Sequence, residues 1–367
     1  MKILFLTHYA RLYGANKSLL SICDRMKDNY EVHVLLPLSG ELSEELKNRN
    51  IKYHIRPYIS SFDKRTNSLR FIRRIRYLPR LLKLVIYLKP DVIYTNTSVI
   101  DYGAFLSLIY RIPHIWHIRE YGDKDYGVTY DAGKRISRFL LKKTDALITI
   151  SKSLQEYLPQ ELDSFLVYNG VPIMEQTQIT PRVLPKKTTS SIVGLLHPSK
   201  GHKLAIKAFA NLMRQNYQAQ LIIAGKGNEE YTSSLFDIAK AEGIEDAVLF
   251  LGYQKKIEEV YNRTDVLLMC SDFEAFGRVT VEAMSYGIPV IGKASGGTPE
   301  IISHRENGLL FNTEEELSSQ MLELITNSEL YRKLSKNALT SVATKFSEKK
   351  YTENIAQLID RIAENSI

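Results

Sequence analysis

DVLLMCSDFEAFGRVTVEAMSYGIPVIGKASGGTPE, residues 265–300, is the stretch from which the fold of this chain follows most directly. It opens on a short apolar run, Asp265–Met269, and a second apolar run, Ile288–Ile291, follows the helix-like segment Gly277–Ser285. Short apolar runs of this length are typical of strands that are buried on both faces. A strand, a helix and a further strand in this order predict a parallel sheet, with the polar segment after each strand at the same edge.

The two polar segments after these strands carry residues suited to a charged, hydroxyl-rich ligand. Glu274 lies in the loop before the predicted helix and Glu282 lies in its second turn, so both can face one cleft. The first backbone amides of that helix lack partners within it and favour anions. After the next strand, Gly296 and Gly297 allow the backbone to approach a ligand closely. Two acids beside two sets of backbone amides suit a diphosphate that is joined to a polyol.

The same alternation of strand-like and helix-like segments extends along the chain, and it restarts after a polar stretch at 175–190. The further candidate strands are Lys2–Thr7, Glu31–Leu36, Asp91–Thr95, His114–Ile118, Asp145–Ile150, Ser164–Val167, Ser191–Gly194, Gln220–Ala224 and Ala247–Leu251. The further candidate helices are Ala15–Lys27, Ser98–Tyr110, Asp131–Lys143, Gly201–Gln215, Glu230–Glu242, Glu314–Asn327 and Ser347–Glu364. This pattern predicts an α/β protein with two doubly wound, Rossmann-like domains.

Length and composition agree with two ordinary globular domains. The chain has 367 residues, and a single core stops growing at roughly 250–300 residues. A hydrophobic content of 44% with 25% charged residues excludes disordered, collagenous and coiled-coil chains. We place the first domain at 1–174, the linker at 175–190 and the second domain at 191–346.

The two cysteines, Cys23 and Cys270, exclude a disulfide framework and a cysteine-rich zinc site, and they are expected to be reduced and buried. The apolar run at the start of the chain is too short for a signal peptide, and no run approaches the ~18–20 residues of a membrane span. The expected location is therefore cytoplasmic, with attachment to the inner face of the cell membrane as a peripheral protein.

The positive charge of the chain is concentrated in its first half. Residues 1–175 carry 27 Lys or Arg and 18 Asp or Glu, although the whole chain has a net charge of only +8. The stretch 64–89 contains nine of these basic residues and no acid, and its helical pattern is kinked or split at Pro79. One side of this helix carries Arg73, Arg76, Arg80 and Lys83, and the other carries Phe71, Ile75, Leu78, Leu82, Val85 and Ile86.

Three interpretations of this basic amphipathic segment are open. It is suited to an anionic membrane surface, or it is a solvated basic face above an apolar face that packs on the core. Nucleic acid is the third interpretation of the charge, but no nucleic-acid motif accompanies it, so we expect no nucleic-acid partner.

A family resemblance is carried by the segment already quoted. The Glu274-x7-Glu282 arrangement, followed by EAMSYGIPVI and GGTPEII, resembles the donor-site signature of glycosyltransferase family 4. The resemblance extends over nearly the whole chain. It implies a retaining, metal-independent hexosyltransferase of the GT-B fold, in which two Rossmann-like domains face a central cleft. It also implies that the C-terminal helix 347–367 crosses back to the first domain.

The resemblance assigns roles to residues of the second domain. Glu274 would hold hydroxyls of the donor sugar, and Glu282 would accept hydrogen bonds from the nucleotide ribose, unless Glu282 only forms a salt bridge on the helix surface. Other donor-binding residues implied by the family are Phe276 and Gly277, which offer amides to the sugar, Gly296, Gly297 and Thr298, which line the sugar–diphosphate, and Gly225 and Tyr253 near the nucleotide.

Lys200 resembles the lysine of this family that contacts the donor diphosphate, where a cation neutralises charge on the departing group. The family usually has an arginine in the same loop, at the position that is Leu195 here. Our hypothesis is that Arg278 supplies the missing cation in its place. A solvated surface role is the alternative for both Lys200 and Arg278.

The first domain carries the remaining candidates. Gly14 resembles the family's first glycine loop, in which backbone amides come near the phosphates, although Tyr13 replaces a frequent second glycine. His117 resembles a histidine that contacts the donor sugar, and we assign it to the catalytic group with Lys200 and Glu274. The acceptor-side candidates are Asn96, Ser98, Arg119 and Glu120, of which the last two could instead pair with each other.

The Asp123-Lys124-Asp125 segment matches the Asp-x-Asp pattern of metal-dependent glycosyltransferases. It lies far in sequence from the donor signature, so we interpret it as a solvated loop and expect no metal site. No other group of His, Cys and acids has the spacing of a metal site, and no cofactor is expected.

The function that this resemblance implies is transfer of a sugar from a nucleotide-diphosphate sugar, with a UDP-sugar favoured, to a hydroxyl of a glycan acceptor. A lipid-linked glycan in cell-surface polysaccharide assembly, such as capsule, suits a basic domain that lies on an anionic membrane. Two alternatives remain open. One is a catalytically inactive GT-B subunit that binds nucleotide or a partner, and the other is a nucleotide-sugar epimerase on the same fold.

Overall fold

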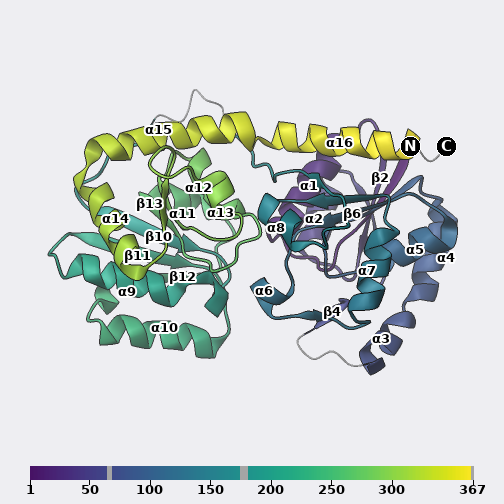
Figure 1. The fold of residues 1–367 in the computed structure, drawn as a ribbon, viewed down its shortest axis with the longest axis horizontal. Helices are drawn as coiled ribbons and strands as arrows, with labels where there is room; N and C mark the ends of the chain where they lie inside the picture. Colours follow the sequence, from purple (N-terminus) through teal and green to yellow (C-terminus); the bar gives the residue numbers. More distant parts are fainter. Residues whose placement is uncertain (64–67, 174–180, 365–367) are drawn as a thin grey trace. The chain divides into compact units, whose positions relative to one another are not determined.

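The chain forms two compact units (Figure 1). The computed structural model describes residues 1–63, 68–173 and 181–364. Unit 1 consists of Met1–Gly170 together with the C-terminal segment that begins at Glu348, and unit 2 is Val171–Ser347. The stretch 175–190 lies within unit 2, and its part 175–180 is outside the described residues. Residues 188–190, which we had placed in the linker, are the start of a strand. Their hydroxyl side chains concealed this strand in the sequence.

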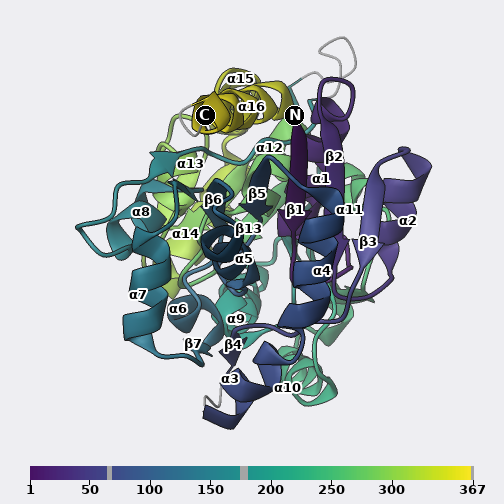
Figure 2. The ribbon, with the colours of Figure 1, turned by 90° about the vertical axis from the view of Figure 1, so that its right-hand side faces the viewer.

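Unit 1 contains a seven-stranded parallel sheet in the order β3–β2–β1–β5–β6–β8–β9 (Figure 2). Its strands are β1 Lys2–Leu6, β2 Glu31–Leu36, β3 Lys52–Ile55, β5 Val92–Thr95, β6 His114–Ile118, β8 Ala146–Thr149 and β9 Phe165–Leu166. A separate antiparallel pair is formed by β4 Phe62–Asp63 and β7 Thr129–Tyr130. The helices are α1 Gly14–Met26, α2 Glu41–Asn48, α3 Ser68–Ile75, α4 Leu78–Leu88, α5 Tyr102–Tyr110, α6 Asp123–Tyr126, α7 Lys134–Lys142, α8 Lys152–Tyr157 and α16 Glu348–Glu364.

Unit 2 contains a six-stranded parallel sheet in the order β12–β11–β10–β13–β14–β15. Its strands are β10 Thr188–Val193, β11 Ala219–Ala224, β12 Val248–Gly252, β13 Val266–Met269, β14 Val290–Lys293 and β15 Leu309–Phe311. The helices are α9 His202–Met213, α10 Glu229–Ala241, α11 Ile257–Arg263, α12 Arg278–Ser285, α13 Thr298–Ile301, α14 Glu314–Thr326 and α15 Ser328–Lys345, with short 3₁₀ turns η1 Pro198–Lys200 and η2 Glu245–Ala247. In both sheets the order reverses beside the first strand, as in doubly wound folds.

Helices cover both faces of the sheet in unit 1. Helices α1, α2 and α16 pack on one face, and α4 and α5 pack on the other (Figure 2). The C-terminal helix α16 places Tyr351, Ile355 and Ile359 in this core, each at most 2% exposed. Their spacing of four residues puts the three side chains on one stripe of the helix. In unit 2, α9, α10 and α14 share a core with one face of the sheet, and α11 packs on the other.

The basic segment is two helices, because Pro79 lies in the first turn of α4, where its missing amide costs no helical hydrogen bond. The four basic side chains singled out above, Arg73, Arg76, Arg80 and Lys83, are exposed. The predicted apolar face is only partly buried. Val85 is in the core, but Ile75 and Ile86 are 50% and 57% exposed. Lys64 and Arg65 lie outside the described residues.

Among the described residues, no helix has both the length and the apolar character needed to cross a bilayer.

Candidate functional site

The centre of the candidate site is an ion pair between Lys200 and Glu274, whose Nζ and Oε2 atoms are 2.7 Å apart. Lys200 ends the 3₁₀ turn after β10, and Glu274 lies in the loop after β13. β10 and β13 are neighbouring parallel strands, so the two residues lie at the same edge of the sheet. The side chains are 21% and 17% exposed, which leaves both within reach of a ligand.

The glycine pair of the next loop holds the Glu274 loop in place. The Gly297 amide donates to the Glu274 carbonyl oxygen over 2.7 Å. A Cβ atom on Gly296 would lie 2.4 Å from that same oxygen, so no larger residue fits, and the φ of +56° also favours glycine. The Gly297 amide, expected from the sequence to face a diphosphate, is therefore engaged within the protein.

A second ion pair lies one turn into α12. The Arg278 Nε donates to Glu282 Oε1 over 2.7 Å, and the Tyr261 hydroxyl donates to Glu282 Oε2 over 2.9 Å. Glu282 is only 13% exposed, so it does not lie on the solvent face of the helix. Tyr261 is fully buried on α11, and no sequence signal pointed to it.

A third ion pair, between Lys293 and Asp272, was missed in the sequence. Lys293 is the last residue of β14, and Asp272 follows β13. The Ser295 hydroxyl donates to the Asp272 carbonyl oxygen over 2.6 Å, which ties the two loops together. The available signal was a charged residue at the end of a buried strand, directly before the loop that already carried Gly296.

Two of the expected donor-binding side chains point into the core of unit 2. Phe276 is 2% exposed and its ring packs against Phe346 at 5.9 Å between centroids. Thr298 is fully buried, and its methyl group occupies the space beside Gly292. Gly277 has a φ of +95° and precedes the first residue of α12. Any contact of these three residues with a ligand is therefore through the backbone.

In unit 1, His117 is fully buried in β6. The Arg119 guanidinium donates to His117 Nδ1 over 3.2 Å, and the Tyr94 hydroxyl lies 2.5 Å from the same nitrogen. Because arginine can only donate, Nδ1 is the acceptor and the neutral ring carries its proton on Nε2. That Nε2 is buried without a hydrogen-bond partner among the described residues. Burial, with the charge of Arg119, lowers the pKa of His117 well below 6.5, so the ring is neutral.

The four acceptor-side candidates fall into two separate networks. Arg119 donates to Asn96 Oδ1 over 2.9 Å and also contacts Asn169 and Tyr351. Glu120 instead accepts from the Ser98 hydroxyl over 2.7 Å and from the Ser98 amide over 3.0 Å. Arg119 and Glu120 thus each have their own partners. Both networks lie at the carboxyl ends of β5 and β6, where ligands bind in sheets of this kind.

Comparison with known proteins assigns the family. A model described as Glycosyltransferase Family 4 matches residues 13–174, and a model described as Glycosyl transferases group 1 matches residues 176–340. The chain belongs to glycosyltransferase family 4.

Relatives of this family 4 glycosyltransferase have several different activities. The N-acetyl-α-D-glucosaminyl L-malate synthase of Bacillus anthracis is 30% identical over 58% of this chain and 58% of its own length, so the match spans little more than half of that relative. The HepE protein of Anabaena, solved with UDP, has a TM-score of 0.81 at 23% identity and covers 98% of this chain and 100% of its own. The lipopolysaccharide outer core galactosyltransferase WaaB has a TM-score of 0.73 at 20% identity, over 98% and 99%. These structures show that the chain has the GT-B fold.

The structure explains the glycine at position 225 and describes the loop before Gly14. A Cβ atom on Gly225 would lie 1.6 Å from the Gly194 carbonyl oxygen, so the loops after β10 and β11 approach too closely for a side chain. Gly14 is the first residue of α1, and the loop before it is held by Asn16, whose amide donates to the carbonyl oxygens of Tyr9 and Arg11. Tyr253, after β12, is 47% exposed.

The Asp-x-Asp segment of the glycosyltransferase is not a solvated loop as we had expected. Asp125 is buried, and its carboxylate accepts from the amides of Tyr121 and Gly122 at 3.0 and 2.7 Å. Burial raises the pKa of Asp125 to about 6. The carboxylate therefore holds the turn before α6. Across residues 1–63, 68–173 and 181–364, no group of three His, Cys, Asp or Glu side chains is arranged to hold a metal ion.

Proposed function

We propose that this protein transfers a sugar from a nucleotide-diphosphate sugar, a UDP-sugar first among them, to a hydroxyl group of a lipid-linked glycan. The observation that supports it best is the set of three cation–carboxylate pairs after β10, β13 and β14. A nucleotide sugar offers phosphate oxygens to cations and hydroxyl donors to carboxylates. It can therefore replace the internal partner of each charged group without leaving any of them unpaired.

Lys200 and Glu274 would divide these tasks. The ammonium group would bind the diphosphate, where negative charge grows as the sugar departs, and the carboxylate would accept from sugar hydroxyls. Arg278, which is held beside the same loop by Glu282, would be the second cation in place of the family's arginine. In this assignment the helix start at Gly277 lies between a negative charge, on Glu274, and a positive charge, on Arg278.

The reaction that we propose is a retaining transfer. The bond from the sugar C1 to the diphosphate oxygen breaks, and the acceptor oxygen bonds to C1 on the same face. The acceptor proton passes to the departing phosphate oxygen. No metal or cofactor enters the proposal, since cationic side chains stabilise the leaving group and the protein contributes orientation and electrostatics.

Different observations support the proposed nucleotide and the proposed acceptor. HepE, of the same fold, binds UDP, and this favours a uridine nucleotide here. In unit 1, the partly buried Glu120 carboxylate can accept from a hydroxyl group, which suits a glycan acceptor. The buried Nε2 donor of His117, which has no hydrogen-bond partner among the described residues, suits a hydroxyl of the donor sugar.

The donor proposal is tested by binding across a panel of UDP- and GDP-sugars, with wild type beside Glu282→Gln. We expect one donor to bind, and Glu282→Gln to weaken it at least about tenfold. Glutamine keeps only one acceptor oxygen and carries no charge, and a hydrogen bond to a charged group is worth roughly 1.5–3 kcal/mol. Glu329→Gln, on the exposed start of α15, is the matched control and should bind normally. A folded wild type that binds no donor would favour the inactive-subunit alternative, which the exposed Leu195 at the arginine position keeps in view.

A peripheral membrane position, on the inner face of the cell membrane, is the second part of the proposal. Exposed Ile72, Ile75 and Ile86 lie on the same two helices as the exposed side chains of Arg73, Arg80 and Lys83. A solvated basic face above a buried apolar face would not leave these residues in water. Apolar and cationic groups exposed together suit the boundary of an anionic membrane.

Replacing Arg73, Arg76 and Arg80 together by Gln should weaken binding to anionic vesicles on the order of a hundredfold, since each basic group near the surface contributes about 1 kcal/mol. Donor binding should be unchanged. The control removes the same charge from exposed lysines of unit 2, as Lys207→Gln, Lys240→Gln and Lys336→Gln. Equal vesicle binding by the two triple variants would rule out a role of α3 and α4 at the membrane.

A further inference from the structure

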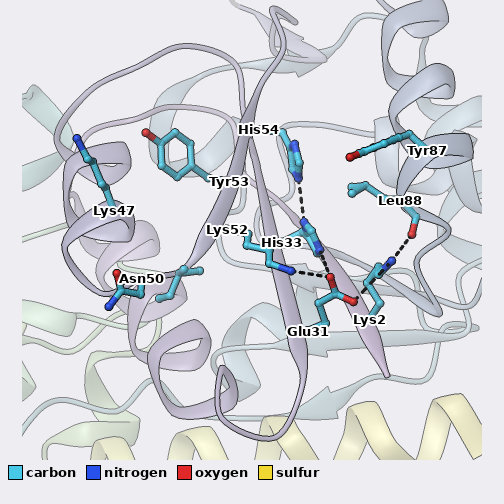
Figure 3. A pocket seen from close by; sticks show the side chains of 11 residues that line it. Lys2, Glu31, His33, Lys47, Asn50, Lys52, Tyr53, His54, Tyr87 and Leu88 are labelled. Atoms are coloured by element: carbon cyan, nitrogen blue, oxygen red, sulfur yellow. Dashed lines mark hydrogen bonds and ion pairs between the residues drawn. The ribbon is translucent and has the colours of Figure 1, made fainter.

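A polar pocket lies beside the amino ends of strands in the unit 1 sheet (Figure 3). It is lined by the first residues of three neighbouring strands, Lys2 of β1, Glu31 of β2 and Lys52 of β3, and has a volume of about 750 Å³. In a parallel sheet the amino ends of the strands lie at one edge, and the residues of the candidate site lie at the other. This pocket is therefore separate from the acceptor-side residues.

The pocket carries an excess of positive charge. Its lining includes three lysines and only one acid, Glu31. The Glu31 carboxylate is shared by Lys52 at 2.8 Å, Lys2 at 3.6 Å and the His33 Nε2 at 3.1 Å. The hydrogen bonds from Lys52 and His33 lower the pKa of Glu31 to about 2, so it stays ionised. One carboxylate cannot neutralise the lysines around it, and the pocket favours an anion.

Two histidines form a directed chain of hydrogen bonds that starts at this carboxylate (Figure 3). An ionised Glu31 can only accept, so His33 donates through Nε2. In the neutral ring His33 Nδ1 is then an acceptor, and His54 Nε2, 2.8 Å away, must donate to it. The direction of both bonds is fixed, and the Nδ1 of His54 is the end of the chain.

This direction determines which histidine can take up a proton without a rearrangement of the pair. A second proton on His33 would require His54 to change tautomer, so that its Nε2 accepts across the 2.8 Å contact instead of donating. A second proton on His54 goes to Nδ1 and leaves both hydrogen bonds intact. Burial, with the charges of His33, Arg56 and Lys52, lowers the pKa of His54 to about 4, so the ring is neutral at neutral pH while no anion is bound.

The groups around His54 are mostly cationic or hydrogen-bond donors. The strands contribute His33, Glu31, Lys2, Lys52 and Tyr53, and the segment after β3 contributes Arg56. The helices contribute Lys47 of α2 and Tyr87 of α4. The Tyr87 hydroxyl points toward His54 from α4 (Figure 3), and its side chain is 80% exposed. Protonated His54, the Tyr87 hydroxyl and Lys52 would together present donors to the oxygens of one tetrahedral anion.

The positive surface continues beyond Tyr87. Tyr87 also lines a neighbouring hollow of about 440 Å³, whose charged lining residues are Arg56, Arg80 and Lys83, with no acid among them. Arg80 and Lys83 belong to the exposed basic side of α4. A ligand that reaches from the first pocket into the second would meet cations along its length.

We propose that the pocket formed by β1, β2, β3 and α4 binds a phosphate group, and that it binds this group more tightly when His54 is protonated. The phosphate would come either from the headgroup of an anionic lipid or from a soluble phosphate compound, which present the same chemistry to the pocket. The proposal does not depend on the transfer reaction, because none of its residues belongs to the candidate site.

The test follows His54 by NMR in the full chain with labelled histidine, and the His54→Gln variant assigns the signal. Sulfate is the probe, because its charge stays constant between pH 5 and 8 and does not confuse the titration. We expect saturating sulfate to raise the pKa of His54 by at least about one unit, which by linkage means about tenfold tighter binding to the protonated form. Sulfate should therefore bind more tightly as the pH falls from 7 to 5.

Two variants separate the roles of the pocket residues. His54→Gln should retain some sulfate binding but lose its dependence on pH. Lys52→Gln should weaken binding at every pH, and Lys207→Gln in unit 2 is the control for the loss of one exposed charge. Buried Trp116, the only tryptophan of the chain, reports by its fluorescence that unit 1 is folded in each variant.

Bicelles of phosphatidylcholine, with or without phosphatidylglycerol, distinguish the two sources of phosphate. A rise in the pKa of His54 with phosphatidylglycerol assigns the pocket to a lipid headgroup. A rise with sulfate alone assigns it to a soluble phosphate compound. If neither sulfate nor phosphatidylglycerol shifts the titration of His54 in a folded protein, the proposal is wrong.

Discussion

Replacing Lys200 by Met is expected to lower kcat for sugar transfer by about a hundredfold to a thousandfold, the range found when one preorganised group that stabilises developing charge is removed. The ammonium group is the cation that we assign to the departing diphosphate, and charge on that group grows only as the bond to C1 breaks. The loss should therefore fall on kcat more than on KM. Steady-state kinetics with the donor found in the binding panel would measure both.

The control for this variant is Lys207→Met, which removes an exposed lysine from the helix that follows the same loop. Because Lys200 is paired with Glu274, Glu274→Gln should also be compared. If the Glu274 carboxylate only holds the lysine, Glu274→Gln should cause the same loss as Lys200→Met. If the carboxylate also binds sugar hydroxyls, Glu274→Gln should in addition raise KM. A change in KM alone for Lys200→Met would make this lysine a binding residue without a part in the chemical step.

Replacing Arg74 by Met should destabilise unit 1 by about 3–5 kcal/mol, the usual cost of removing one partner of a buried ion pair. The Arg74 guanidinium is 2.5 Å from Asp101 Oδ1 and 2.9 Å from Asp131 Oδ2, and the side chains of both acids are fully buried. Without Arg74, Asp101 would lose its cation, and Asp131 would keep only Arg70, whose Nε lies 3.6 Å from its Oδ2. Urea unfolding followed by the fluorescence of Trp116 would measure the loss within unit 1.

The neighbouring Arg73 provides a close control, since it is exposed on the same helix and its change to Met should alter stability by less than about 0.5 kcal/mol. The pH dependence gives a second check. Burial already raises the pKa of Asp131, and in Arg74→Met this pKa should rise further. The carboxyl would then be protonated on mild acidification, so the difference between variant and wild type should shrink as the pH falls. A difference that does not change with pH would mean that lost packing, and not charge, destabilises the variant.

The sequence was sufficient for the central strands of both sheets and insufficient for their edges. The strands predicted at Glu31–Leu36 and His114–Ile118 have the same bounds in the structure, because strands buried on both faces are short apolar runs. The edge strand β3 reads KYHI, and its polar residues face the pocket that contains His54, so no apolar run marked it. Helix α15 was missed because its buried positions are spaced among many polar residues.

The candidate site was predictable as a set of positions but not as a set of contacts. Strand ends in a parallel sheet meet at one edge, so Lys200 and Glu274 could be expected near each other from topology alone. Which amides a loop keeps for itself depends on turn geometry, and for that reason the engagement of Gly297 with Glu274 was not foreseen. The environment of Glu282 depends on Tyr261, which belongs to a helix that the sequence did not indicate.

The packing of α16 on unit 1 has a consequence for how the protein is made. The core of unit 1 is missing Tyr351, Ile355 and Ile359 until the last part of the chain has left the ribosome. Unit 2 is continuous in sequence and can complete its core earlier, although its first residue comes after most of unit 1. The domain that is synthesised first is thus finished last, and during the interval it exposes an apolar strip. Ribosome pausing before α16 is synthesised, or removal of the segment from Glu348 onward, would leave this strip exposed to chaperones and to aggregation.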